Sequence, residues 1–246
     1  MRVLILGAGP QLKDNETPVW LAEAHGEVLV ERFVNACNGL GAKLVFAVRR
    51  QDVRRFHIDN VIKLASPDAA VVAIDGDTQG APCTALLCVH LIDPEGELLI
   101  LNSNEFLDID YRAPVEDFRQ RGLDAGVVTF RSLHPRYSYM LVDDQGLIVE
   151  AAEKRPISRH ATAGFYWYRR GADFVQSAQD MIRKDAHVDD RFFISLTLNE
   201  LVLKHKRMGI HRWTPSTIAR SNRSGRSRFT RPISTRRRRN EAGAAE

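Results

Sequence analysis

Short apolar runs alternate with amphipathic stretches through the first half of this chain. Apolar runs bounded by polar residues are typical of buried strands, whereas apolar residues about three or four positions apart are typical of helices. The runs predict strands at Val3–Leu6, Lys43–Val48, Ala70–Ile74, Leu98–Leu101 and Ala125–Phe130. The stretches between them predict helices at Val28–Cys37, Val53–Leu64, Cys83–His90 and Val115–Arg121. This alternation favours a mostly parallel sheet with helices on both faces.

The second half of the chain predicts antiparallel strands as well. Ser138–Val142 and Leu147–Ala151 flank the stretch Asp143-Asp-Gln-Gly146, a pattern typical of a β-hairpin. Gly164–Tyr168 reads as an aromatic strand, and helical spacing recurs at Gly171–Arg183 and Leu196–Lys206. We therefore expect an α/β fold whose N-terminal half is doubly wound and whose C-terminal half contributes a mixed sheet.

Composition narrows the class of protein. The chain has 246 residues and 44% hydrophobic content, enough for a large core. No apolar run approaches the roughly 20 residues of a membrane-spanning helix, and the apolar N-terminus lacks the basic region of a signal peptide. Cys37, Cys83 and Cys88 have neither metal-ligand nor disulfide-framework spacing. We expect a cytoplasmic protein with reduced thiols.

The positive charge of the chain is concentrated near its C-terminal end. Nine arginines and two glutamates lie between Arg220 and Glu246, so the net charge of +4 leaves the remainder mildly acidic. After Trp213 the apolar residues are too sparse to offset the entropy of ordering the chain. We expect a folded domain over residues 1–213 and a disordered Arg/Ser-rich tail over 214–246. Charge alone would attract Arg236–Arg239 to nucleic acid or anionic lipid, but four adjacent arginines are weak evidence, and we expect no nucleic-acid partner.

The first predicted strand runs into a glycine turn, Gly7-Ala8-Gly9. Turns of this kind bring backbone N–H groups against phosphate. One interpretation is a Rossmann dinucleotide fold in an NADP-binding oxidoreductase, with Arg49-Arg50 holding a 2′-phosphate. However, Leu12 occupies the third glycine position, and the polar loop up to Pro18 leaves no helix start at Gly9. We therefore favour a different nucleotide-binding fold.

Several short motifs occur in a fixed order along the chain. They are Gly26-Glu-Val-Leu-Val-Glu31-Arg32, Phe56-His57-Ile-Asp59-Asn60, Asp75-Gly76-Asp-Thr78-Gln79-Gly80-Ala81, Leu99-Ile-Leu-Asn102-Ser103-Asn104-Glu105, Ser138-Tyr139, and Glu153-Lys154-Arg-Pro156 with Thr162 and Gly164 downstream. By their order and spacing the chain resembles the sugar-phosphate nucleotidyltransferases, in particular their short bacterial branch in surface-polysaccharide pathways. The resemblance implies a Rossmann-like, three-layer (GT-A-like) fold with a mixed central sheet. It also implies that a nucleoside triphosphate is coupled to a sugar 1-phosphate, or a related phosphate monoester, with release of pyrophosphate.

The resemblance implies roles for particular residues. It places nucleotide binding on two loops, at Leu6, Gly7, Ala8, Gly9, Gln79, Gly80 and Ala81. It places the sugar phosphate on Glu153, Lys154 and Thr162, and gives Lys13 and Lys154 catalytic roles as cations. Because a phosphate monoester is already anionic near neutral pH, the reaction needs charge neutralisation and alignment rather than a general base. The implied cofactor is Mg²⁺, with Asn104 and Glu105 as candidate ligands.

Three positions depart from the family pattern. Gln11 replaces a glycine of the first loop, and Val19 replaces the lysine of a Pro-Lys pair. Asn104 stands where the family places the carboxylate that anchors Mg²⁺. These departures leave open a second hypothesis, a degenerate homologue that binds nucleotide or sugar phosphate and regulates or scaffolds a pathway. The sequence also leaves the nucleobase, the sugar and the oligomeric state open, with a homo-oligomer among the alternatives.

Overall fold

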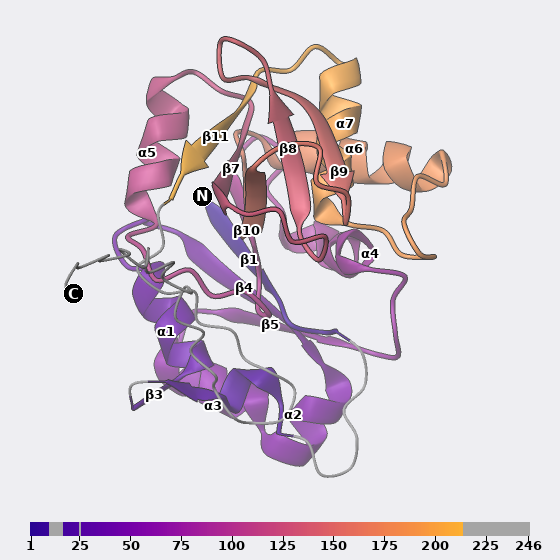
Figure 1. Cartoon of the computed structure of the whole chain (residues 1–246). Coiled ribbons are helices and arrows are strands. Elements are labelled where there is room, and N and C mark those ends of the chain that lie inside the picture. The colour runs from indigo at the N-terminus through magenta and orange to yellow at the C-terminus, as the bar shows by residue number, and fades with distance from the viewer. Residues whose placement is uncertain (10–16, 25, 214–246) are drawn as a thin grey trace, which may run out of the picture.

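The computed structural model describes residues 1–9, 17–24 and 26–213 (Figure 1). Gln11, Lys13 and the predicted tail over 214–246 lie outside these ranges. Within them, a nine-stranded mixed sheet organises the fold, and helices cover both of its faces. None of the described helices combines the length and apolar character needed to cross a membrane.

The described residues form eleven strands and seven α-helices, which mostly alternate in the first half of the chain. The strands are β1 (Arg2–Leu6), β2 (Glu23–Ala24), β3 (Glu27–Val28), β4 (Lys43–Arg49), β5 (Ala70–Ile74), β6 (Leu98–Asn102), β7 (Ala125–Arg131), β8 (Ser138–Val142), β9 (Ile148–Glu153), β10 (His160–Tyr168) and β11 (Met208–Arg212). The helices are α1 (Leu29–Ala36), α2 (Arg50–Phe56), α3 (Ile58–Ala65), α4 (Ala81–Leu86), α5 (Arg112–Gln120), α6 (Gly171–Arg183) and α7 (Ile194–Leu203). Two short 3₁₀ turns, η1 (Val19–Leu21) and η2 (Val89–Leu91), complete the described elements.

The central sheet mixes parallel and antiparallel strands, which confirms the predicted fold class. Its path is β11-β7-β10-β6-β1-β4-β5, and the β8–β9 hairpin joins it through β10. Strands β6, β1, β4 and β5 run parallel, whereas β10 is antiparallel to both β6 and β7. The carboxyl ends of the parallel strands therefore share one edge, the usual place for ligands in open α/β sheets.

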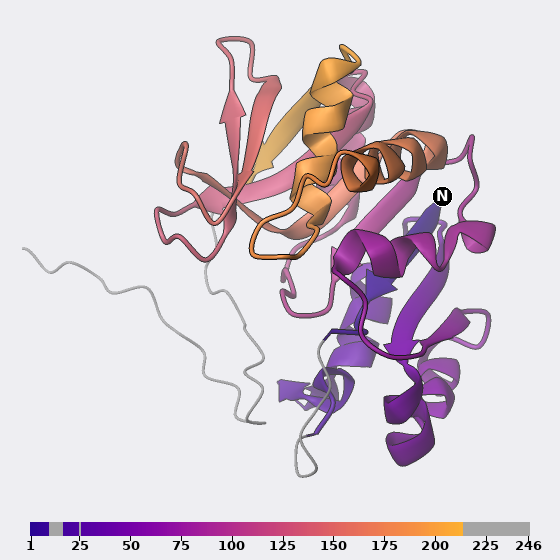
Figure 2. The ribbon, with the colours of Figure 1, turned by 90° about the vertical axis from the view of Figure 1, so that its right-hand side faces the viewer.

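Alternating side chains of the strands face two hydrophobic cores. In β1, Val3 and Ile5 face the core that α1, α3 and α5 cover, while Leu4 and Leu6 face the core that α4, α6 and α7 cover. This division follows from the two-residue period of a strand. Figure 1 shows α1, α2 and α3 gathered beside β4 and β5, and Figure 2 shows α6 and α7 together near α4. The result is the three-layer architecture that the resemblance implied.

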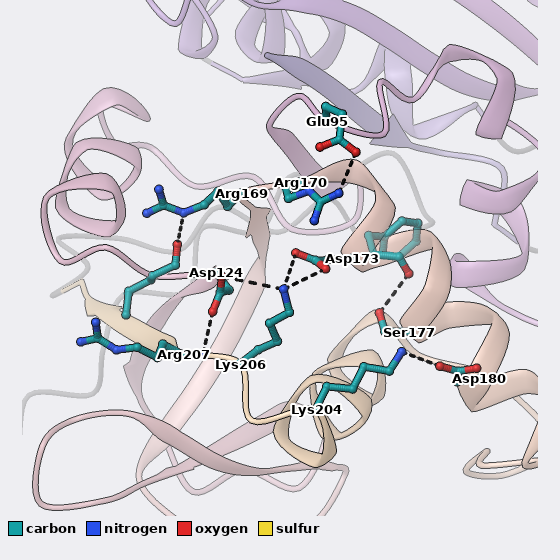
Figure 3. Close-up of polar contacts among 12 residues, drawn as sticks. Glu95, Asp124, Arg169, Arg170, Asp173, Ser177, Asp180, Lys204, Lys206 and Arg207 are labelled. Carbon is teal, nitrogen blue, oxygen red and sulfur yellow. Dashed lines mark hydrogen bonds and ion pairs between the residues drawn. The ribbon is translucent and has the colours of Figure 1, made fainter.

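A polar cluster ties the last helices and strand to the sheet (Figure 3). Lys206, between α7 and β11, has its Nζ 3.2 Å from Asp173 of α6 and 4.0 Å from Asp124, just before β7. Asp124 also accepts a 2.8 Å hydrogen bond from the backbone N–H of Arg207. Lys204, at the end of α7, pairs with Asp180 of α6 at 2.6 Å. These contacts hold α6 against the C-terminal end of α7 and against the segment that leads into β11.

Several elements differ from the sequence prediction. The predicted helix Cys83–His90 is replaced by α4, which ends at Leu86, and by η2, which begins at Val89, and strands β2 and β3 were not predicted. The stretch Val53–Leu64 is not one helix but parts of α2 and α3, because His57 between them has a left-handed backbone with φ 51°. The aromatic strand begins at His160 rather than Gly164, and its pairing with β7 is irregular around Gly164, whose φ is 71°. Strand β11 does not follow from the apolar pattern, yet it pairs in parallel with β7.

Candidate functional site

A cavity of about 430 Å³ opens at the carboxyl ends of β1 and β6. Seven of the residues that were given a site role from the sequence line it: Leu6, Ala8, Gly9, Gly80, Ala81, Asn104 and Lys154. The remaining lining comes from Asp77, Thr78, Thr84, Asn102, Ser103, Arg191, Phe192 and Phe193. The first strand, the second predicted loop and the loop after β6 therefore meet at one place. We call this space the larger cavity.

Within the glycine turn, the individual residues have different surroundings. A Cβ atom at Gly7 would lie 1.7 Å from a ring carbon of Trp20, so this glycine makes room for a buried indole. Its backbone N–H donates to the Ala47 carbonyl at 2.9 Å, and Gly7 is not in the lining of the larger cavity. Gly9 lines the cavity and has no described atom within 4 Å of a Cβ position. The turn thus combines packing at Gly7 with open backbone at Gly9.

The loop at Gln79 and Gly80 is joined to the connection between α6 and α7. The Phe192 N–H donates to the Gln79 carbonyl at 2.8 Å, and Gly80 forms a parallel bridge with Phe192. Gly80 has φ 141°, and a Cβ atom there would lie 2.1 Å from the Phe192 carbonyl oxygen. Only glycine allows this close approach. The contact that demands a glycine is therefore with Phe192, while Gly80 also lines the larger cavity.

A smaller cavity of about 260 Å³ adjoins the larger one. Its lining includes Glu153 and Thr162, which were predicted to bind the sugar phosphate, and Glu105, which was predicted to be a metal ligand. The two cavities share five lining residues: Ala81, Asn102, Asn104, Lys154 and Phe193. Arg136, Tyr137, Ser138, Tyr166, Ile194 and Ser195 complete the lining of the smaller cavity. Residues that are far apart in the sequence thus form two joined spaces.

Glu153, the last residue of β9, is a buried carboxylate with an exposed fraction of 8%. One of its oxygens, Oε2, accepts hydrogen bonds from the hydroxyls of Ser138 and Ser195, the latter at 3.0 Å. Burial raises the pKa of this carboxyl above its ordinary value, although both hydroxyls and the adjacent Lys154 oppose the shift. Folding therefore holds a carboxylate in the wall of the smaller cavity at a cost in solvation.

Lys154 lies where the two cavities meet. Its backbone is left-handed, with φ 56°, and its N–H donates to the Tyr137 carbonyl at 3.0 Å. Its ammonium is 2.7 Å from Asp189 and 5.5 Å from the centre of the Phe193 ring. A positive charge at this junction can neutralise a phosphate that approaches from either cavity.

Thr162 and Glu105 both line the smaller cavity near the irregular part of β10. The Thr162 hydroxyl is bonded to the buried Tyr166 hydroxyl at 3.0 Å, and burial raises the pKa of Tyr166. The Glu105 carboxylate lies close to Gly164, where a Cβ atom would be 3.2 Å from Oε2. Glu105 lines the smaller cavity, whereas Asn104 lines both.

The donors for a metal ion are few in the described part of the chain. No group of three or more His, Cys, Asp or Glu side chains is placed there to hold a metal ion. Asn104 and Glu105 are consecutive, and Asp77 brings another carboxylate to the larger cavity. Mg²⁺ is commonly held by one or two carboxylates together with waters and substrate phosphates. Asn104, Glu105 and Asp77 are among the oxygen donors that the two cavities offer a cation.

Sequence reasoning did not identify the contribution of the connection between α6 and α7. Arg191, Phe192 and Phe193 line the larger cavity, yet they belong to no motif. Their place depends on the Gly80–Phe192 bridge, and the only local signal in the sequence is the glycine at 80, which the close approach of a second chain segment requires. Lys13 lies outside the described residues, and Gln79 contributes its carbonyl to Phe192 rather than a wall of the larger cavity.

Comparison with known proteins shows the class of fold. No protein-family profile and no curated protein matches the sequence. A nucleoside-diphosphate-sugar pyrophosphorylase from Vibrio cholerae RC9 aligns with a TM-score of 0.72 and 19% identity, over 92% of this chain and 96% of that one. A Bacillus anthracis protein assigned as a glucose-1-phosphate thymidylyltransferase, solved with sucrose, aligns with a TM-score of 0.66 and 17% identity, over 87% of each chain. The chain therefore has the Rossmann-like fold of the sugar nucleotidyltransferases.

Proposed function

We propose that this protein is a nucleotidyltransferase that couples a nucleoside triphosphate to a sugar 1-phosphate, or a related phosphate monoester, and releases pyrophosphate. The observation that carries the proposal is the pair of adjoining cavities with Lys154 at their junction. The larger cavity, at the carboxyl ends of β1 and β6, is the proposed nucleotide site. The smaller cavity, beside Glu153, is the proposed acceptor site. The motifs of the short bacterial branch make surface-polysaccharide precursors the proposed products.

The proposed reaction places simple demands on the residues. An acceptor phosphate oxygen attacks the α-phosphorus of the nucleotide. The bond between the α-phosphorus and the oxygen that bridges it to the β-phosphate breaks, and pyrophosphate leaves. The attacking oxygen is already anionic, so the residues must align two anions and offset their repulsion. Lys154 would supply positive charge at the meeting point, and Glu153 would accept hydrogen bonds from acceptor hydroxyls. Gly9, which has open space around its Cβ position, would let the nucleotide approach the backbone closely.

Mg²⁺ is the proposed cofactor. Asn104 and Glu105 are its proposed ligands, and Asp77 is a further carboxylate of the larger cavity. When bound, the ion would neutralise part of the charge of the triphosphate. Because the described residues offer few carboxylates, we expect Mg²⁺ to bind much more tightly with nucleotide than without it.

The amide at Asn104 favours a second candidate function. An uncharged ligand at a position that borders both cavities would weaken the hold on a cation. The second candidate is a homologue that binds nucleotide or sugar phosphate without efficient transfer and regulates a pathway. The NADP-dependent oxidoreductase loses support, because the first described α-helix begins only at Leu29 and Arg50 is paired with Asp75 at 2.5 Å.

A pyrophosphate-release screen separates these candidates. The full-length protein is incubated with Mg²⁺, each nucleoside triphosphate and a panel of sugar 1-phosphates, and nucleotide binding is measured in parallel by calorimetry. We expect release that needs one matched pair and that stops when Mg²⁺ is chelated. If the protein binds nucleotide but releases no pyrophosphate with any pair, the result would favour the regulatory homologue. Both candidates would be contradicted if the protein released no pyrophosphate and bound neither a nucleoside triphosphate nor a sugar 1-phosphate in the same calorimetric measurement.

A further inference from the structure

The connection between α6 and α7 contacts both proposed substrate sites. Val188 and Arg191 exchange backbone hydrogen bonds of 3.0 and 3.1 Å, so they close a tight turn around Asp189 and Asp190. The next residue, Phe192, is bonded to the loop of Gln79 and Gly80. Further on, the Ser195 hydroxyl donates to Glu153. The turn is therefore anchored between the nucleotide loop and the wall of the smaller cavity.

At the tip of this turn, Asp189 pairs with Lys154. The Asp189 carboxylate lies 2.7 Å from the Lys154 ammonium, and the Phe193 ring lies on the same ammonium at 5.5 Å. Two residues of one connection thus contact a lysine from the end of a different hairpin. The contact falls at the junction of the two cavities, because Lys154 and Phe193 line both.

Stability alone does not account for this contact. Asp189, Asp190 and Lys154 all have left-handed backbones, with φ of 51°, 56° and 56°, a conformation that aspartate tolerates better than lysine does. The ion pair is well exposed, with side-chain fractions of 42% for Lys154 and 72% for Asp189. Exposed ion pairs add little to folding stability. Since the pair adds little to folding stability, we look for its benefit in the site.

We propose that Asp189 is a positioning residue, whose carboxylate holds the Lys154 ammonium at the junction of the two cavities before the substrates arrive. The inference rests on the proposed function and goes beyond it, since it assigns a role to a residue outside every motif. A lysine side chain has many rotamers, and holding it in one place removes part of the ordering that the reaction would otherwise require. The turn itself is held by Phe192 on the nucleotide loop, so the lysine is aligned with the nucleotide site.

The test compares two neighbouring aspartates of the same turn. Asp189→Asn preserves size and tolerance of the left-handed backbone but removes the charge that holds Lys154. Asp190→Asn is the matched control, because Asp190 shares the turn and the backbone and has no ion pair among the described residues. With the matched substrates, we expect kcat to fall about tenfold in Asp189→Asn, with the acceptor KM within about twofold. Asp190→Asn should match the wild type, and Asp189→Glu should recover part of the loss.

A second measurement needs no turnover. Amine-selective labelling of Lys154, followed by peptide mass spectrometry without substrates, is expected to be faster in Asp189→Asn than in the wild type or Asp190→Asn. Equal labelling in all three proteins, or an equal loss of kcat in both asparagine variants, would overturn the inference. A wild type without turnover for any substrate pair would contradict the proposed function, and labelling would still decide whether Asp189 holds Lys154.

Discussion

Glu153 illustrates at the scale of one residue how the candidate site departs from ordinary packing. The carboxyl group is buried at the end of β9, and its Oε2 receives two serine hydroxyls. Burial raises its pKa, so ionised Glu153 weakens the folded state. A neutral side chain of the same shape would fold better. We interpret the retained carboxylate as one that serves acceptor binding.

This interpretation predicts opposite effects of Glu153→Gln on stability and on activity. Because the folded pKa lies above the ordinary value of 4.5, the penalty is absent below that pH and grows as the pH rises through the folded pKa. The variant should therefore be more stable than the wild type at pH 7 and similar at pH 4 in urea unfolding. Its pyrophosphate release should fall at least about tenfold. A variant that is less stable at pH 7 and fully active would contradict this account.

Gly80 makes a second prediction at the residue scale. Gly80→Ala would place a methyl group 2.1 Å from the Phe192 carbonyl oxygen at φ 141°, so the Gly80–Phe192 bridge must open. We expect a loss of about 1–3 kcal/mol in unfolding free energy together with weaker nucleotide binding. Gly9→Ala is the control for stability alone, because Gly9 lines the same cavity with open space around its Cβ position. Equal thermal midpoints for the two variants would argue against the bridge as a structural constraint.

At the scale of elements, the apolar pattern predicts the central strands well, but it misses the break between α2 and α3 and the strand β11. The runs in β1, β4 and β6 are buried on both faces, so each is apolar throughout and easily recognised. The break between α2 and α3 escapes the pattern, because His57 changes the backbone without interrupting the apolar spacing. Strand β11 escapes because Gly209, His211 and Arg212 dilute its apolar character, and pairing with β7 decides its conformation.

The ion pair between Asp180 of α6 and Lys204 at the end of α7 predicts how the stability of the fold changes at low pH. Asp180 accepts a hydrogen bond from Lys204, with Gln176 and Arg183 as further donors, and these lower the pKa of its carboxyl to about 2. A lowered pKa adds stability that is fully present above the ordinary value of 3.8 and is lost as the pH falls toward 2. Asp180→Asn should therefore be less stable than the wild type at pH 6, and the difference should vanish near pH 2 in urea unfolding. Asp190→Asn, on an exposed turn, should show no such difference; a pH-independent difference for Asp180→Asn would contradict the assignment.

At the scale of the whole molecule, the sequence predicts the motif residues that line the two cavities better than it predicts the contribution of the connection between α6 and α7. The motifs predict that Gly9, Gly80, Asn104 and Lys154 belong together, and these residues line one cavity. Motifs near the carboxyl ends of parallel strands can be predicted to lie together, since those ends meet at one edge of the sheet. The position of the turn at Asp189 and Arg191 cannot be predicted in this way, because it depends on the backbone bridge between Phe192 and the distant Gly80.

The central claim is that the two cavities bring a nucleotide and a phosphate monoester together at Lys154. The most direct measurement follows a label on the α-phosphate of the nucleoside triphosphate in the presence of the matched acceptor. We predict that the label appears in a product that contains the acceptor, and that Lys154→Gln lowers this transfer by on the order of 10²-fold or more. Label that stays in the nucleotide for every acceptor, although nucleotide binds, would contradict the claim. Transfer that is unchanged in Lys154→Gln would contradict it as well.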